Sequence, residues 1–132
     1  TIPPEVFAFV KDYRKFCLNL SPRESDLYDW YVHNLVYKLT LLPTGEVTLI
    51  YGGNPSGQIS TTTDNIMVNT FLSAFEYGYL YKQAFGTCPS LDVYYKDYHM
   101  ICYGDDRLCG FSMFPYDIDM VVSLYRDVFG MW

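Results

Sequence analysis

The sequence predicts an α+β fold, in which helices and antiparallel strands are mixed without the regular strand–helix–strand order of a parallel sheet. Two pairs of short apolar runs, each joined by a turn rich in Gly, Pro or Asp, predict two β-hairpins. Four further segments carry apolar residues at helical spacing. The chain has 132 residues, half of them hydrophobic, which is enough for the core of one ordinary domain.

The chain is expected to begin with two helices. Apolar residues recur at helical spacing over residues 6–17, after a Pro-Pro pair that suits the first turn of a helix. After a short break, a second helix is expected over residues 24–37. The two histidines, His33 in this helix and His99 in a later strand, stand alone in the sequence. We therefore expect both to be packed or surface residues rather than metal ligands.

A first hairpin and a long helix are expected next. Residues 37–42 and 46–51 alternate apolar with polar side chains and flank a Pro-Thr-Gly turn. The loop of residues 52–57 is too rich in Gly and Pro to continue the strand. A helix is then expected over residues 59–85, and its first turns are rich in Ser, Thr, Asp and Asn. Such a polar start suits either a ligand-facing surface or capping and solvation, and composition leaves both open.

The second hairpin is expected around Gly104-Asp105-Asp106. A strand within residues 91–103 leads into this turn, and the apolar run 108–114 follows it. Gly adopts positive φ without steric cost and Asp can bond its own backbone, so the turn is expected to display two carboxylates at its tip. Mg²⁺ prefers such oxygen ligands in phosphoryl transfer, although the tripeptide alone favours a plain solvated turn. An amphipathic helix over residues 115–129 completes the predicted order.

Charge and cysteine content restrict the class of protein. The formal net charge of −6 argues against a free-standing nucleic-acid-binding protein, because such proteins usually carry a basic face. It is compatible with an acidic catalytic subdomain whose basic groove comes from neighbouring segments. The four cysteines form no C-x-x-C pair and are expected to be reduced, buried thiols of a cytosolic protein: Cys17, Cys88, Cys102 and Cys109. The sequence shows no apolar stretch long enough for a transmembrane segment and no signal peptide.

Two motifs stand at a fixed spacing within this order of elements. The first has the pattern S-G-x-x-x-T-x-x-x-N and consists of Ser56, Gly57, Thr61 and Asn65. The second is Y-G-D-D at residues 103–106, with Asp105 lying 49 residues beyond Ser56. Together they resemble motifs B and C in the palm domain of RNA-directed RNA polymerases from positive-strand RNA viruses. The surrounding residues are similar to those of astrovirus polymerases in particular, and the resemblance covers essentially the whole chain.

The resemblance implies a metal site at the carboxylate turn. Asp105 would bind both catalytic metal ions, and Asp106 would be a nearby, lesser ligand. Mg²⁺ is the implied cofactor, with Mn²⁺ as an alternative ion. The implied reaction is in-line attack of the 3′-hydroxyl of an RNA strand on the α-phosphate of a ribonucleoside triphosphate, with pyrophosphate as the leaving group.

The first motif would contact the incoming nucleotide and the RNA. By resemblance, Ser56 and Gly57 would form a flexible loop that adjusts to the template and the nascent base pair. Asn65 would help to recognise the ribose hydroxyls, supported by Thr61, because an amide can both donate and accept a hydrogen bond. Asp64 beside it would either orient Asn65 or favour the N-terminal region of the helix.

The resemblance further implies that residues 1–132 are a partial palm domain. The motif A aspartate, the motif D lysine, the fingers and the thumb would lie outside the chain, so the 132-residue fragment is expected to be inactive alone. The implied partners are an RNA template, a primer or nascent strand, ribonucleoside triphosphates and the remaining fingers and thumb. The implied location is a viral replication complex in the host cytoplasm, with any membrane attachment supplied by other proteins.

Two alternatives stay open from the sequence. A reverse-transcriptase-like palm would usually carry a different residue in place of Gly104 and would lack the spacing of the first motif. A non-catalytic binding or structural domain would carry the acidic turn incidentally. Divalent ions would then cause no change that maps to Asp105.

Overall fold

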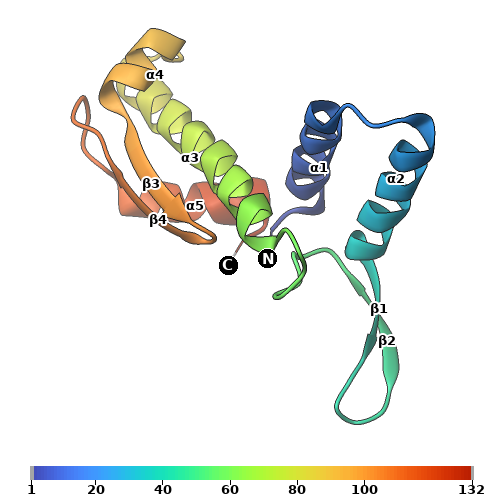
Figure 1. The fold of residues 1–132 in the computed structure, drawn as a ribbon. Coiled ribbons are helices and arrows are strands. Elements are labelled where there is room, and N and C mark those ends of the chain that lie inside the picture. The colour runs from blue at the N-terminus through green and yellow to red at the C-terminus, as the bar shows by residue number, and fades with distance from the viewer. Residues whose placement is uncertain (1, 132) are drawn as a thin grey trace.

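The computed structural model describes residues 2–131 and confirms the predicted α+β fold, with two antiparallel hairpins among helices (Figure 1). Its elements in chain order are α1 (Pro4–Leu18), α2 (Pro22–Val36), β1 (Tyr37–Leu41), β2 (Val47–Tyr51), α3 (Thr61–Phe85), α4 (Leu91–Asp97), β3 (His99–Tyr103), β4 (Asp106–Gly110) and α5 (Ile118–Phe129). The four predicted helices and both hairpins are present. Among residues 2–131, every helix is too short or too polar to be a membrane span.

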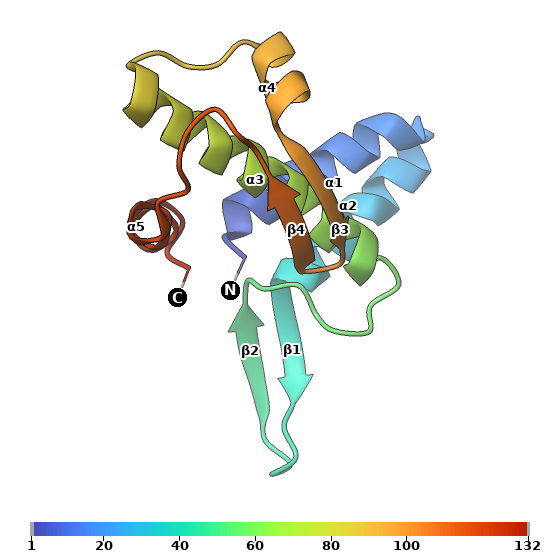
Figure 2. The same ribbon diagram turned by 90° about the vertical axis from the view of Figure 1, so that its left-hand side faces the viewer.

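The helices α1 and α2 and the first hairpin follow one another along one side of the molecule. Asn19 ends α1 in a left-handed conformation, with a φ of 49°. A capping box starts α2, in which the Ser21 backbone N–H donates to the Glu24 carboxylate over 2.9 Å. The β1–β2 hairpin continues from α2 and projects away from the other elements (Figure 1, Figure 2). Its second strand is exposed along its whole length.

The long helix α3 takes part in both hydrophobic clusters of the described chain. Near its start, Val68 and Leu72 pack with Val6 and Val10 of α1. Nearer its end, a second cluster surrounds the fully buried Tyr77 and consists of Leu80, Tyr98, Phe114 and Val121. Figure 1 shows α3 between α1 on one side and the β3–β4 hairpin with α5 on the other. The elements that carry both sequence motifs are therefore packed on one helix.

The segment of residues 91–103 contains the expected strand at its end, but its first part forms a helix that the sequence analysis did not predict, α4 (Leu91–Asp97). Ser90 caps this helix by accepting a hydrogen bond from a backbone N–H of the first turn over 3.3 Å. Tyr94 and Tyr98, four residues apart, stack with ring centroids 5.2 Å apart, and both contact Tyr77 of α3. Val and Tyr residues favour strands locally, but packing at helical spacing outweighs that preference here.

The second hairpin is shorter than predicted. Strand β3 occupies only the last five residues of the predicted strand segment. Strand β4 starts directly at Asp106 and ends at Gly110, before Phe114. The ladder ends with Gly110 opposite His99, the first residue of β3, and beyond it the backbone N–H and the hydroxyl of Ser112 donate to the Asp97 carboxylate, both over 2.9 Å.

The predicted burial of the cysteines is also wrong. Cys17 and Cys88 are exposed, and Cys102 and Cys109 are half-buried. Apolar neighbours in the sequence do not place a thiol in the core when those neighbours are themselves exposed, as Phe16 is at 83%. All four thiols are free within the described chain, as expected for reduced cysteines.

Candidate active site

The carboxylate turn is a tight two-residue turn. Strands β3 and β4 pair with Tyr103 opposite Asp106, which leaves Gly104 and Asp105 as the central residues. Gly104 has a φ of 62° and Asp105 does not have a positive φ, the pattern of a type II′ turn. Asp105 therefore lies at the tip as predicted, whereas Asp106 is the first residue of β4 rather than a tip residue. Both aspartates are exposed.

A hydrogen bond between distant parts of the chain holds this turn against α3. The Asn69 side-chain amide donates to the Gly104 carbonyl oxygen over 2.9 Å. Gly104 is buried, so the bond satisfies a backbone group that is shielded from water. Asn69 thus fixes the backbone directly before Asp105 and leaves the carboxylate itself exposed.

An ion pair between the half-buried Arg107 and the buried Glu76 anchors β4 one residue after Asp106. The Arg107 guanidinium donates to the Glu76 carboxylate of α3 over 2.5 Å. Glu76 is 1% exposed and also accepts hydrogen bonds from the Tyr116 and Tyr125 hydroxyls, over 3.1 and 2.9 Å. Burial is the largest single influence and lowers the pKa of Arg107, but the hydrogen bond to Glu76, the negative charge of Glu76 and the nearby tyrosines together raise that pKa above its ordinary value, so the guanidinium stays charged. Because side chains alternate along a strand, Asp106 faces the exposed side of the hairpin, opposite to Arg107.

The loop before α3 combines an exposed tip with a fixed junction. Gly57 has a φ of 83°, and no atom lies within 4 Å of the position of an added Cβ. Ser56 and Gly57 are both exposed. The Thr61 hydroxyl donates to the Pro55 carbonyl oxygen over 2.6 Å and so ties the loop to the first turn of α3. Ser56 and Gly57 therefore protrude from the loop directly after Pro55, which is bound to the first turn of α3.

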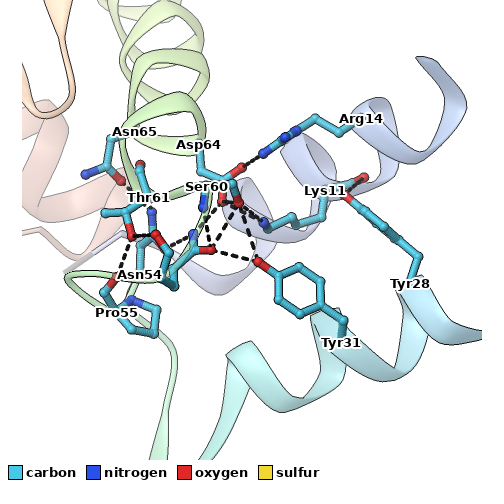
Figure 3. Close-up of polar contacts among 11 residues, drawn as sticks. Lys11, Arg14, Tyr28, Tyr31, Asn54, Pro55, Ser60, Thr61, Asp64 and Asn65 are labelled. Atoms are coloured by element: carbon cyan, nitrogen blue, oxygen red, sulfur yellow. Dashed lines mark hydrogen bonds and ion pairs between the residues drawn. The ribbon is translucent and has the colours of Figure 1, made fainter. Parts of the chain in front are cut away.

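Asp64 is the centre of a buried charge network at the start of α3 (Figure 3). Its carboxylate accepts from Lys11 and Arg14 of α1, each over 2.5 Å, and from the Ser60 hydroxyl over 2.9 Å. Burial is the largest single influence and raises the pKa of Asp64, but the hydrogen bonds from these three donors and the positive charge of Lys11 together lower it by more. The pKa therefore lies below its ordinary value, and Asp64 is an ionised acceptor.

Asn65 lies on the next position of α3 and contacts the loop. Its side-chain oxygen accepts a hydrogen bond from the Asn54 amide over 2.8 Å. Asn65 and Asn69 are four residues apart and share one face of the helix, and Asn69 holds the Gly104 carbonyl. Thr61 and Asn65 lie in the first turns of α3, and the bond from Asn69 holds the carboxylate turn to the same half of that helix. Figures 1 and 2 show the β3–β4 turn near this end of α3.

Three residues of this region were not identified from the sequence. Lys11 and Arg14 lie three positions apart on α1, and the only sequence signal for Lys11 is that it follows apolar residues at helical spacing. Asn69 was also missed, and its spacing of four from Asn65 is its only signal. Each of these residues acts through a partner far away in the sequence.

The donor set at the turn fits part of a divalent-ion site. Within residues 2–131, no three His, Cys, Asp or Glu side chains converge so that they could hold a metal ion. Asp105 and Asp106 offer two adjacent, exposed carboxylates, which are ligands of the kind that hard divalent ions take. The remaining ligands would have to come from phosphates, water or other parts of the protein.

An α+β fold that sets a carboxylate turn beside the polar start of a long helix is the arrangement expected of a polymerase palm. The family model described as viral RNA-dependent RNA polymerase matches residues 1–132, so the chain belongs to this family.

Three relatives with similar sequences show that the chain resembles astrovirus proteins. They are the non-structural polyproteins 1AB of Turkey astrovirus 1, Human astrovirus-1 and Avian nephritis virus 1, which are 49%, 46% and 45% identical to this chain. Each match covers the whole chain and 9% of the polyprotein, so the chain spans less than a tenth of the length of these relatives. The resemblance to astrovirus polymerases drawn from the two motifs is confirmed.

Proposed function

We propose that this chain is the palm segment of an RNA-directed RNA polymerase that copies viral RNA in infected cells. The observation that carries the proposal is the hydrogen bond from Asn69 to Gly104, because it holds the Asp105 turn against the helix that presents Asn65. Carboxylates for metal ions and an amide for the ribose then lie at one end of α3. Membership of the viral RNA-dependent RNA polymerase family supports the same activity.

The proposed chemistry is transfer of a nucleotide to the 3′-hydroxyl of an RNA strand. When bound, Mg²⁺, or Mn²⁺ in its place, lowers the pKa of this hydroxyl and neutralises charge on the phosphate. Asp105 provides the main carboxylate ligand from the exposed turn, and Asp106 a lesser one from the start of β4. Because the turn is short and bonded through Gly104, both carboxylates keep a defined position relative to α3.

The loop and the helix start position the nucleotide. Asn65 contacts the ribose hydroxyls, while Thr61 holds the loop onto the helix. Ser56 and Gly57 adjust to the template and the nascent base pair. The positive φ of Gly57 and its open surroundings support this role, because glycine changes its backbone conformation at little steric cost.

Other parts of the polymerase complete the site. A motif A aspartate adds a metal ligand, a motif D lysine acts near the pyrophosphate, and the fingers and thumb supply the basic channel for RNA, which a chain of net charge −6 does not provide. Exposed apolar side chains such as Leu39 and Leu41 of β1, at 80% and 70% exposure, suit contacts with those parts. The template, the primer or nascent strand and ribonucleoside triphosphates meet in the host cytoplasm.

Replacing Asp105 in the polymerase that contains this segment tests the proposal. Asp105→Asn keeps the side-chain shape but removes a charged ligand, so template-directed ribonucleotide incorporation is expected to fall by at least about a hundredfold. Asp119→Asn, in the first turn of α5 and also exposed, is the matched control and is expected to keep near-wild-type incorporation. Near-wild-type incorporation by Asp105→Asn would contradict the metal role.

A further inference from the structure

We infer that Asn54 is a positioning residue for ribose discrimination, which holds Asn65 with its amide nitrogen turned out of the loop towards the nucleotide. This role rests on the proposed function of Asn65 and adds a residue that belongs to neither sequence motif. A series of hydrogen bonds connects the side-chain amides of Asn54 and Asn65 to groups that can only donate or only accept (Figure 3).

At one end of this hydrogen-bond series, a backbone group defines the orientation of Gln58. The Ser60 backbone N–H donates to Gln58 Oε1 over 2.9 Å, and a backbone N–H can only donate. The other atom of the Gln58 amide is therefore the nitrogen. Gln58 Nε2 donates to the ionised Asp64 carboxylate over 2.9 Å and to Asn54 Oδ1 over 3.0 Å.

At the other end, a backbone carbonyl defines the orientation of Asn54. Asn54 Nδ2 donates to the Thr61 carbonyl oxygen over 3.3 Å, and a carbonyl oxygen can only accept. The same nitrogen donates to Asn65 Oδ1 over 2.8 Å. Two independent partners, Gln58 and the Thr61 carbonyl, thus agree on which atom of Asn54 faces Asn65. Turning either amide round would set two donors or two acceptors against each other.

The orientation of Asn65 has a chemical consequence for the ligand. Its oxygen is bonded to Asn54, and Figure 3 shows its nitrogen on the side away from Asn54. Within residues 2–131, this nitrogen donates to no other group of the chain. An amide nitrogen pairs only with an acceptor, and a ribose hydroxyl oxygen is one. A deoxyribonucleotide lacks the 2′-oxygen, so it offers one acceptor fewer.

The test is the preference of the polymerase for ribonucleotides over deoxyribonucleotides, measured as the ratio of their kcat/KM values opposite the same template base. Asn54→Leu keeps a similar size but removes the donor and the acceptor, so Asn65 is no longer held in one orientation. Loss of one oriented hydrogen bond is expected to lower the ratio about three- to tenfold. The change is expected in a higher KM for the ribonucleotide, with the deoxyribonucleotide parameters nearly unchanged.

A second variant keeps the shape of the side chain. The carboxylate of Asn54→Asp can only accept, so Asn65 is expected to turn its nitrogen inward, and the ratio is expected to fall as in Asn54→Leu. Asn34→Leu is the control. Asn34 of α2 is exposed and donates from its amide to the Trp30 carbonyl oxygen over 2.8 Å, so this variant removes a bond of the same type. Its ratio is expected to equal that of the wild type.

Two results would overturn the role of Asn54. Both Asn54 variants could keep the wild-type ratio while they incorporate ribonucleotides, which would show that Asn54 does not orient Asn65. The kcat/KM values of both Asn54 variants could also fall to the same extent for ribonucleotides and deoxyribonucleotides, which would show that Asn54 supports only the fold of the loop. A folded wild-type polymerase that incorporates neither substrate would instead contradict the proposed function, and the role of Asn54 with it.

Discussion

The buried carboxylate of Asp64 connects the start of α3 to α1. Its cationic partners Lys11 and Arg14 both belong to α1, and Lys11 is itself only 1% exposed. Removing one partner of a buried ion pair typically costs about 3–5 kcal/mol, because the remaining charge is left without compensation. The network therefore fixes α1 beside the loop that orients Asn65, and its strength depends on the ionised form of Asp64.

The stability that Asp64 contributes is expected to depend on pH. Its folded pKa lies below the ordinary value of 3.8, so the contribution is present above that value and is lost as the pH falls through the folded pKa. Asp64→Asn is expected to lower the unfolding temperature at pH 7, and the difference from the wild type is expected to shrink below about pH 4. Thermal unfolding from pH 7 to pH 3 measures this, with the exposed Asp26→Asn as control. A difference that stays constant over this range would exclude the ionised network.

At the scale of elements, the β3–β4 hairpin presents Asp105 in a conformation that two features maintain. Gly104 occupies the first central position of the turn with a φ of 62°. Asn69 binds the carbonyl oxygen of the same residue. The direction of the Asp105 side chain follows from this backbone, because Asp105 is the next residue in the turn.

Gly104→Ala is expected to lower both stability and incorporation. No atom lies within 4 Å of the added Cβ, so the cost comes from backbone strain at positive φ, about 1 kcal/mol or more. Gly78→Ala is the matched control, since Gly78 also has room for a Cβ but lies inside α3. It is expected to stabilise the fold by up to about 1 kcal/mol and to leave incorporation unchanged. Unfolding temperatures and incorporation rates of the two variants measure this, and equal losses in both would refute the role of the turn conformation.

Local sequence patterns predicted most elements but few of the contacts between them. Turn residues and apolar periodicity act over short distances, so both hairpins and the long helix could be found. Helix α4 could not, because Tyr94 is held by packing on Tyr77 of another helix. The family resemblance that the two motifs carry identified the candidate site residues, whereas Lys11 and Asn69 were missed because their partners lie 53 and 35 residues away.

At the scale of the whole molecule, α3 connects both hydrophobic clusters with the candidate site. Its first half packs on α1 and its second half on the hairpin and α5. Along its length, polar side chains hold the second hairpin, namely Asn69, Ser73 and Glu76. A displacement of the carboxylate turn relative to Asn65 would have to break these bonds. We therefore expect the distance in space between the two motifs to stay constant.

The dependence of incorporation on Mg²⁺ concentration tests whether the Asp105 turn binds the catalytic metal ions. It is measured by primer extension with the polymerase that contains this segment, as wild type, Asp105→Asn and Asp106→Asn. The wild type is expected to require Mg²⁺, and Asp106→Asn to need a higher Mg²⁺ concentration for half of its maximal rate. Asp105→Asn is expected to stay inactive at every Mg²⁺ concentration, as is the isolated 132-residue chain. An Asp105→Asn enzyme with the wild-type rate and Mg²⁺ dependence would show that the metal ions bind elsewhere.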